Sequence, residues 1–236
     1  MPVSLEKVEQ AAPGLVSLYK HAAVSLDKHG LSGERAAVYL VLDRSGSMRD
    51  YYRDGSVQHL AEQTLGLAAH FDDDGTVPVV FFSTGVDGID EVSLTAYAGR
   101  INALNDAYGH MGRTDYAAAM TAVIDHYRRS GARAPGFVVF QTDGAPSSKS
   151  AATEVLCGAA GLPLFWQFIG FGADEFRFLR RLDDLPVPAK RVVDNAGFFP
   201  AGKDPRSISD AELYDRLTAE FPQWLAAARA KGIVSG

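Results

Sequence analysis

Three side chains that carry oxygen atoms lie two residues apart directly after an apolar run. Asp43, Ser45 and Ser47 follow residues 36–42, which are rich in valine and leucine. A spacing of two residues directs side chains to the same side where the backbone stays extended, and Gly46 permits a tight backbone between them. Carboxylate and hydroxyl oxygens are ligands for hard cations, so this loop is a candidate metal site.

Two further loops offer ligands of the same kind. Thr114 lies where a predicted helix opens, after the turn-rich residues 108–113, and Asp143 follows the predicted strand 137–142. In a doubly wound sheet, ligands bind outside the carboxyl ends of the strands, at the switch point of the topology. The sequence therefore predicts one site with five ligands: Asp43, Ser45, Ser47, Thr114 and Asp143.

The chemistry of this set indicates which cation it would hold. It contains two carboxylates and three hydroxyls, with no sulfur or imidazole. Hard oxygen ligands suit Mg²⁺, or Mn²⁺ and Ca²⁺, rather than zinc. Two carboxylates roughly balance one divalent cation, which would still attract an acidic group from outside. Because Mg²⁺ usually keeps water ligands, an exchangeable position is expected.

Strands and helices alternate along the chain. Short apolar runs predict strands, and apolar residues at helical spacing predict helices. The predicted strands are 36–42, 77–83, 89–97, 137–142, 164–169 and 191–193; the predicted helices are 57–71, 101–105, 114–129, 147–160, 175–182 and 209–231. Residues 5–29 are predicted to be helical with a break near Pro13, and 198–204 is the most linker-like loop. The alternation predicts an α/β fold with a doubly wound, mostly parallel sheet and helices on both faces.

Length, charge and cysteine content narrow the class of protein. The chain has 236 residues, a net charge of −6 and a pI of about 5.5, which argues against a nucleic-acid or anionic-membrane partner. Its single cysteine, Cys157, forms no internal disulfide and is expected to be a buried residue on a helix. The first residues lack a signal-peptide layout, and no apolar run is long enough to span a membrane. A soluble, cytoplasmic protein is expected.

The three loops resemble the metal-ion-dependent adhesion site of von Willebrand factor A domains. The matching motifs are Asp43-x-Ser45-x-Ser47, the Gly-x-Thr114-Asp115 turn and the Thr142-Asp143-Gly144 turn. By this resemblance Ser45, Ser47 and Thr114 would contact the metal directly or nearly so. Asp43 and Asp143 would act largely through bound water.

The resemblance covers residues 33–231, so the chain divides into an N-terminal helical extension, 1–32, and a von Willebrand factor A domain, 33–236. The segment 22–28 is also similar to the bacterial tellurium-resistance-associated and copine-like branch of the family. That branch implies an assembly scaffold in a bacterial stress or toxic-oxyanion resistance system.

Several residues beside the predicted ligands have simpler interpretations. Tyr51 stands where a further carboxylate would help a second metal, so one metal is expected. Asp115 is expected to cap the helix that begins there. Four cationic or imidazole residues are expected to be solvated in loops, with a ring of positive potential for an acidic partner as the alternative: Arg44, Arg49, His110 and Arg113.

Three functions compete at this stage. The leading hypothesis is a binding module, not an enzyme, whose metal is completed by an Asp or Glu of a protein partner. The first alternative is a Mg²⁺-dependent phosphatase of the haloacid-dehalogenase type. Such an enzyme needs a second carboxylate as general acid where this chain has Ser45, and an ordinary hydroxyl cannot replace it efficiently. The second alternative is a structural domain that folds without metal.

Overall fold

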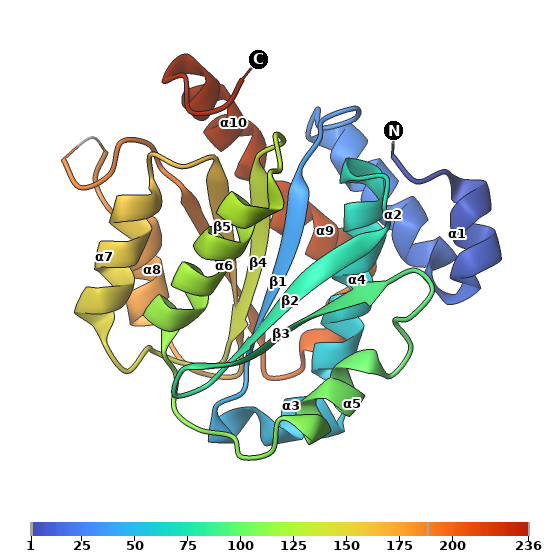
Figure 1. Ribbon diagram of the computed structural model, residues 1–236, viewed down its shortest axis with the longest axis horizontal. Helices are drawn as coiled ribbons and strands as arrows, with labels where there is room; N and C mark the ends of the chain where they lie inside the picture. Colours follow the sequence, from blue (N-terminus) through green and yellow to red (C-terminus); the bar gives the residue numbers. More distant parts are fainter. Residues whose placement is uncertain (1, 188, 236) are drawn as a thin grey trace.

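The computed structural model describes residues 2–187 and 189–235, and in them six strands form one sheet (Figure 1). Their order is β3-β2-β1-β4-β5-β6, with only β3 antiparallel. The strands are β1 (Ala37–Asp43), β2 (Thr76–Phe82), β3 (Val86–Ser93), β4 (Gly136–Thr142), β5 (Leu164–Phe171) and β6 (Ala196–Gly202). This topology confirms the predicted fold class, and the edge position of β3 matches its prediction. The strand order reverses between β1 and β4, which is where ligands bind in such sheets.

Helices cover both faces of the sheet. They are α1 (Leu5–Ala11), α2 (Val16–Lys28), α3 (Arg49–Arg53), α4 (Ser56–Phe71), α5 (Arg100–Ala107), α6 (Tyr116–Ser130), α7 (Lys149–Ala159), α8 (Arg177–Asp183), α9 (Asp210–Thr218) and α10 (Phe221–Ala230). The core on the α4, α9 and α10 side includes Leu40 and Leu42, whereas the core on the α6, α7 and α8 side includes Tyr39 and Val41. Alternate residues of β1 thus face opposite cores, so the strand is apolar throughout.

Side-chain caps explain where several helices begin. Ser148 accepts a hydrogen bond from the backbone of Ala151, and Ser209 accepts one from Glu212. Such caps satisfy amide groups that the first helical turn leaves without partners.

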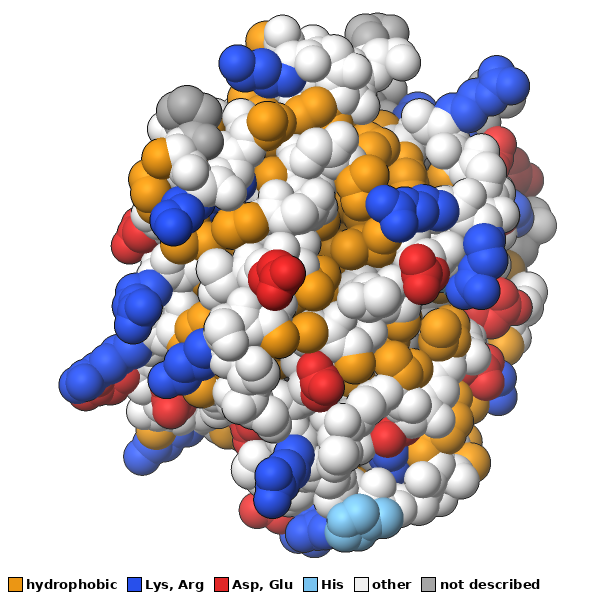
Figure 2. All heavy atoms as spheres, turned by 60° about the vertical axis from the view of Figure 1, so that its left-hand side comes forward, with side chains coloured by type: hydrophobic (Ala, Val, Ile, Leu, Met, Phe, Trp, Pro, Cys, Tyr) orange, Lys and Arg blue, Asp and Glu red, His pale blue; other side chains and the backbone are white. Residues whose placement is uncertain are grey.

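Figure 2 shows the outer surface of α7 and α8, which carries charged side chains of both signs. Hydrophobic side chains gather in the upper half of this view. None of the helices in the described ranges is long and apolar enough to cross a membrane.

The N-terminal helices pack on the rest of the molecule. The helix break expected near Pro13 is present as a short 3₁₀ turn, Pro13–Leu15, between α1 and α2. Leu18 and Leu26 of α2 share the core that α4 and α9 enclose, and Ser25 Oγ lies 2.9 Å from a carboxylate oxygen of Asp215 on α9. The division at 32/33 stays a prediction, and its outermost residues, 1 and 236, lie outside the described ranges.

The predictions for the last strand and for the loop after it were wrong. Residues 191–193 are not a strand because the buried Arg191 side chain turns back to the carbonyl oxygens of Asp183 and Leu185. Strand β6 instead occupies most of the predicted loop 198–204. This stretch contains Pro200, and proline is tolerated in an edge strand such as β6. A Cβ at Gly197 would lie 2.8 Å from Gln167 Oε1, so the end of that side chain would have to shift to admit one.

Two smaller predictions also needed correction. The helix predicted at 209–231 is two helices, α9 and α10, because Pro222 lacks the amide hydrogen that a continuous helix requires. Pro222 lies in the first turn of α10, where this loss is harmless. Cys157 lies on α7 as expected but is only half-buried.

Asp183 should make stability depend on pH. Burial, with Glu220, Asp194 and Asp184 nearby, raises its pKa to about 7. The folded chain then holds a proton that the unfolded chain has released, so stability falls as pH rises from about 4 to 7. We expect Asp183→Asn to be more stable than the parent at pH 8 by about 1–2 kcal/mol, a figure reduced for the partial exposure of the group, and to lose that advantage at pH 4.

Urea unfolding at pH 4, 6 and 8 measures this difference. Asp125→Asn is the matched control, because it removes the same charge from an exposed position on α6. An advantage for Asp183→Asn that is constant across pH, or that grows toward acid, would contradict the expected destabilisation by the ionised carboxylate.

Candidate metal centre

The first and third loops meet because β1 and β4 are neighbouring parallel strands, paired as far as Leu42 and Gln141. Asp43, the last residue of β1, is fully buried. One of its carboxylate oxygens accepts a hydrogen bond from the Ser45 amide at 2.6 Å, and the other accepts one from Thr142 Oγ1 at 2.7 Å. The carboxylate is therefore held rigidly at the carboxyl edge of the sheet.

The serine hydroxyls lie between the two carboxylates. Ser45 Oγ is 3.2 Å from Ser47 Oγ and 3.4 Å from an oxygen of Asp143. Asp43 and Ser45 are buried, Asp143 is half-buried and Ser47 is exposed. The structure thus brings four of the predicted ligands together in a cluster that is closed beneath and open toward solvent.

Thr114 lies on the second loop, which is fixed beside the first by backbone contacts. The Gly46 amide donates to the Gly112 carbonyl oxygen at 3.0 Å, and the Ser147 amide donates to the Thr114 carbonyl oxygen at 2.7 Å. Within the described ranges, no hydrogen bond joins the Thr114 hydroxyl to the other four candidate ligands. Asp115 caps α6 by accepting from the Ala118 amide at 3.0 Å, which confirms its predicted capping role.

Burial dominates the electrostatics of the two carboxylates. It raises the pKa of Asp43 to about 7, although hydrogen bonds from Thr142 and Ser45 act in the opposite direction. Burial also raises the pKa of Asp143, while the Ser47 and Ser45 hydroxyls lower it. Two partly desolvated carboxylates side by side favour a bound cation, because it offsets their mutual repulsion.

The donor set fits a hard divalent cation. Ser47 and Asp143 each place an oxygen within 3.4 Å of Ser45 Oγ, and Asp43 places one 2.6 Å from the Ser45 amide nitrogen. None of these side chains supplies sulfur or imidazole. In the part of the chain that the structure describes, no three His, Cys, Asp or Glu side chains gather as a metal site. A site here would therefore depend on hydroxyl and water ligands as well as carboxylates, which suits Mg²⁺ or Mn²⁺ better than zinc.

The prediction for Arg44 was wrong, since its side chain is fully buried rather than solvated. Its guanidinium forms an ion pair with Asp87 at 2.7 Å and makes no hydrogen bond to the candidate ligands within the described ranges. In an extended backbone, successive side chains point to opposite sides, so residue 44 points away from the side shared by Asp43 and Ser45. The sequence spacing could therefore have predicted that Arg44 does not join the candidate ligands. Arg49, His110 and Arg113 are exposed, as expected.

Sequence reasoning missed the residues that support Asp43 from behind. Thr142 Oγ1 donates to the carboxylate and also accepts from Tyr116 Oη at 3.0 Å. Tyr52 Oη donates to the Asp43 carbonyl oxygen at 3.1 Å. The position of Thr142 directly before Asp143 was a usable signal. The two tyrosines come from separate helices and carry no local pattern.

The parallel sheet, its switch point and the three loops gathered there define a von Willebrand factor A domain. Over residues 35–234 the chain matches the family described as "vWA found in TerF C terminus", and it belongs to that TerF-like family. It is 37% identical over 219 residues to the uncharacterized protein YcbR of Bacillus subtilis, across 91% of this chain and 88% of YcbR. Both findings confirm the predicted family and branch.

Two solved structures have a similar fold. The manganese-loaded TRAP protein of Plasmodium vivax has a TM-score of 0.51 at 18% identity, covering 78% of this chain and 74% of that protein. A von Willebrand factor type A protein from Catenulispora acidiphila has a TM-score of 0.51 at 20% identity, covering 79% of this chain and 42% of that protein. At these identities the likeness shows the fold alone.

Proposed function

We propose that this chain is a metal-dependent protein-binding module. Asp43, Ser45, Ser47, Thr114 and Asp143 would hold one divalent cation, and an Asp or Glu of a protein partner would complete its coordination. The observation that carries this proposal is the oxygen cluster around Ser45 Oγ, closed beneath by Thr142 and Asp43 and open above at Ser47. An open metal position is what a ligand from another molecule requires.

Mg²⁺ is the cation that we propose, with Mn²⁺ or Ca²⁺ as substitutes. Oxygen ligands and few formal charges support Mg²⁺, and the similarly folded Plasmodium vivax TRAP protein was solved manganese-loaded. We further propose a cytoplasmic scaffold in a bacterial tellurium or stress resistance system. Membership of the TerF-like family supports that setting.

The surface beside the candidate site offers room for more of a partner than its carboxylate. A cavity of about 330 Å³ borders Gly144 and is lined by Asp174, Phe176 and Arg177. Phe176 has a φ of 50°, in the left-handed region that glycine prefers, and such backbone strain is often found at functional sites. We propose that a partner bound at the metal also contacts this cavity.

A catalytic role has no supporting observation in this site. Ser45 occupies the position where a haloacid-dehalogenase-type phosphatase needs its second carboxylate, and its hydroxyl is engaged with Ser47 and Asp143. Domains of the von Willebrand factor A type are generally interaction modules. We therefore propose a non-enzymatic role.

Adding Mn²⁺ should stabilise the protein against heat. A ligand that binds only the folded state at a hundredfold excess over its Kd contributes about 2.7 kcal/mol. For a chain of this size, that corresponds to a rise in Tm of roughly 5–10 °C. Differential scanning calorimetry with Mn²⁺, Mg²⁺ or EDTA measures it. An unchanged Tm at millimolar Mn²⁺ would favour a structural domain that folds without metal.

Partner binding tests the rest of the proposal. The immobilised chain is exposed to cytoplasmic extract in Mn²⁺ or in EDTA, and retained proteins are identified by mass spectrometry. A genuine partner should be retained only in Mn²⁺, and substituting its contact Asp or Glu by Asn or Gln should release it. Partners retained equally in EDTA would contradict binding through the metal.

A further inference from the structure

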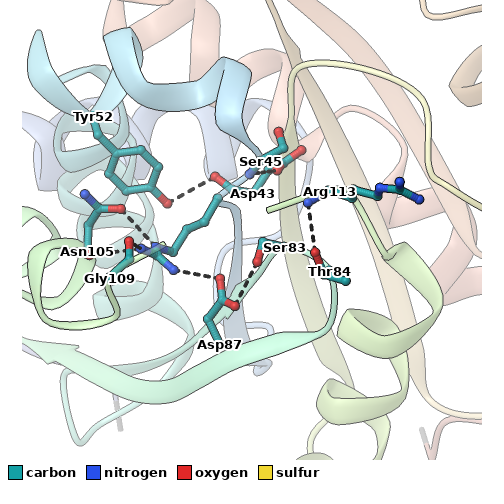
Figure 3. A network of polar contacts seen from close by, with 10 residues as sticks. Asp43, Ser45, Tyr52, Ser83, Thr84, Asp87, Asn105, Gly109 and Arg113 are labelled. Atoms are coloured by element: carbon teal, nitrogen blue, oxygen red, sulfur yellow. Dashed lines mark hydrogen bonds and ion pairs between the residues drawn. The ribbon is translucent and has the colours of Figure 1, made fainter. Parts of the chain in front are cut away.

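The side chain of Arg44 lies inside the molecule although the residue belongs to the first metal loop. Beyond its ion pair with Asp87, its Nε donates to Asn105 Oδ1 at 2.9 Å. Its Nη2 donates to the carbonyl oxygens of Asn105 and Gly109 at 3.0 and 3.1 Å. The guanidinium also lies over the Tyr108 ring, 5.5 Å from its centre. The Arg44 guanidinium thus joins three segments of the chain, and its partners Asp87, Asn105 and Gly109 are labelled in Figure 3.

Two of those segments border the second metal loop. Asn105 belongs to α5, and Gly109 begins the stretch that leads to Thr114. The guanidinium binds both carbonyl oxygens through a single nitrogen, so it fixes the path of the backbone where α5 ends. Without that cation these carbonyl oxygens would lose a buried, charge-assisted partner.

The third segment is the start of β3, where Asp87 lies, and together with the turn before it this segment holds the far end of the same loop. Asp87 accepts a hydrogen bond from Ser83 Oγ at 2.8 Å, and the Ser83 carbonyl oxygen accepts one from the Asp115 amide at 2.8 Å. The Arg113 amide donates to Thr84 Oγ1 at 3.1 Å. The approach is so close that a Cβ on Gly112 would lie 2.3 Å from Thr84 Oγ1.

We propose that Arg44 is a positioning residue that sets metal affinity by fixing the Thr114 loop against the Asp43 loop. The inference rests on the proposed metal function and names a residue that touches no metal ligand through its side chain. A guanidinium serves several acceptors in one plane, which a lysine ammonium cannot do. Loops held in advance at the binding geometry need not be ordered when the cation arrives, so affinity rises.

A merely structural role for Arg44 predicts something different. It would lower stability without affecting how Thr114 contributes to binding. A positioning role couples the two residues, because Thr114 can help the metal only while its loop is held in place. A double-mutant cycle between Arg44 and Thr114 separates the two roles.

Isothermal titration with Mn²⁺ on the full chain is the experiment. Arg44→Lys keeps a positive charge beside Asp87 but loses the guanidinium nitrogens that donate to Asn105 and Gly109. We expect it to weaken Mn²⁺ binding about tenfold, as loss of a supporting residue typically does. Thr114→Ala should also weaken binding, and the double variant should be no weaker than Thr114→Ala alone. The control Arg53→Lys changes an exposed arginine on α3 and should bind like the parent.

Unchanged affinity in Arg44→Lys, or effects that simply multiply in the double variant, would overturn the proposal. If Arg44→Lys fails to fold, Asn105→Ala removes the acceptor of Nε and leaves the ion pair intact, and its cycle with Thr114→Ala is judged by the same criterion. If the parent itself binds no Mn²⁺, the metal function fails rather than the role of Arg44.

Discussion

Asp143→Ala is expected to abolish detectable Mn²⁺ binding, with a loss of affinity of at least about a hundredfold. Asp143 is one of only two carboxylates in the oxygen cluster, and its oxygen lies 3.4 Å from Ser45 Oγ. Removing it leaves a divalent cation facing a single carboxylate, so the charge balance of the site is lost. Isothermal titration measures the affinity, and the Mn²⁺-induced rise in Tm should disappear with it.

The same substitution should leave the metal-free fold intact. Burial of the Asp143 carboxylate disfavours its charged form, as its raised pKa indicates. Removing the carboxylate should therefore not lower the free energy of unfolding of the metal-free protein. Asp50→Ala is the matched control, because Asp50 follows the same loop but is exposed and pairs with Arg53. Equal Mn²⁺ affinity in the parent and in Asp143→Ala would show that the metal binds elsewhere.

Phe221→Ala is expected to destabilise the protein by about 3–5 kcal/mol, the usual cost of removing a fully buried phenylalanine. Phe221 begins α10 and is fully buried. Its ring centre lies 4.9 Å from that of Phe137 on β4, 5.7 Å from Phe165 on β5 and 5.9 Å from Phe71 on α4. The substitution would leave a cavity between the sheet and two helices, and urea unfolding at neutral pH measures the loss.

Val24→Ala provides the comparison for that result. Val24 is 69% exposed on α2, so shortening it removes little apolar surface from contact, and we expect a change below about 0.5 kcal/mol. A loss below about 1 kcal/mol in Phe221→Ala would mean that α10 is not part of the cooperative core. Mn²⁺ affinity in Phe221→Ala should match the parent at temperatures where it remains folded, since α10 lies outside the three loops.

Local patterns in the sequence were sufficient for the central features of this protein. The run before Asp43 is apolar at every position because β1 has a core on each face, and such a run is typical of a covered, parallel strand. The alternation of strands and helices then predicted the sheet and its switch point. Ser45 and Asp143 could be assigned to one site because parallel strands end at the same edge.

Other features depended on contacts between residues far apart in the chain. Residues 198–204 were expected to form a loop, yet residues 198–202 belong to the edge strand β6 because β5 offers a partner along that stretch. Arg44 is a charged residue in a loop and was expected to be solvated, but its guanidinium forms an ion pair with Asp87, 43 positions away.

The Asp-x-Ser-x-Ser loop shows both sides of this division. The sequence by itself determined the family, the fold class and the oxygen chemistry of the loop, because residue type and spacing fix backbone direction and ligand kind. Only the tertiary structure decided that Thr142 holds Asp43 from behind and that Arg44 joins the first loop to the second. Those contacts join segments between 61 and 99 residues apart, and no local pattern encodes which distant groups a buried polar side chain will meet.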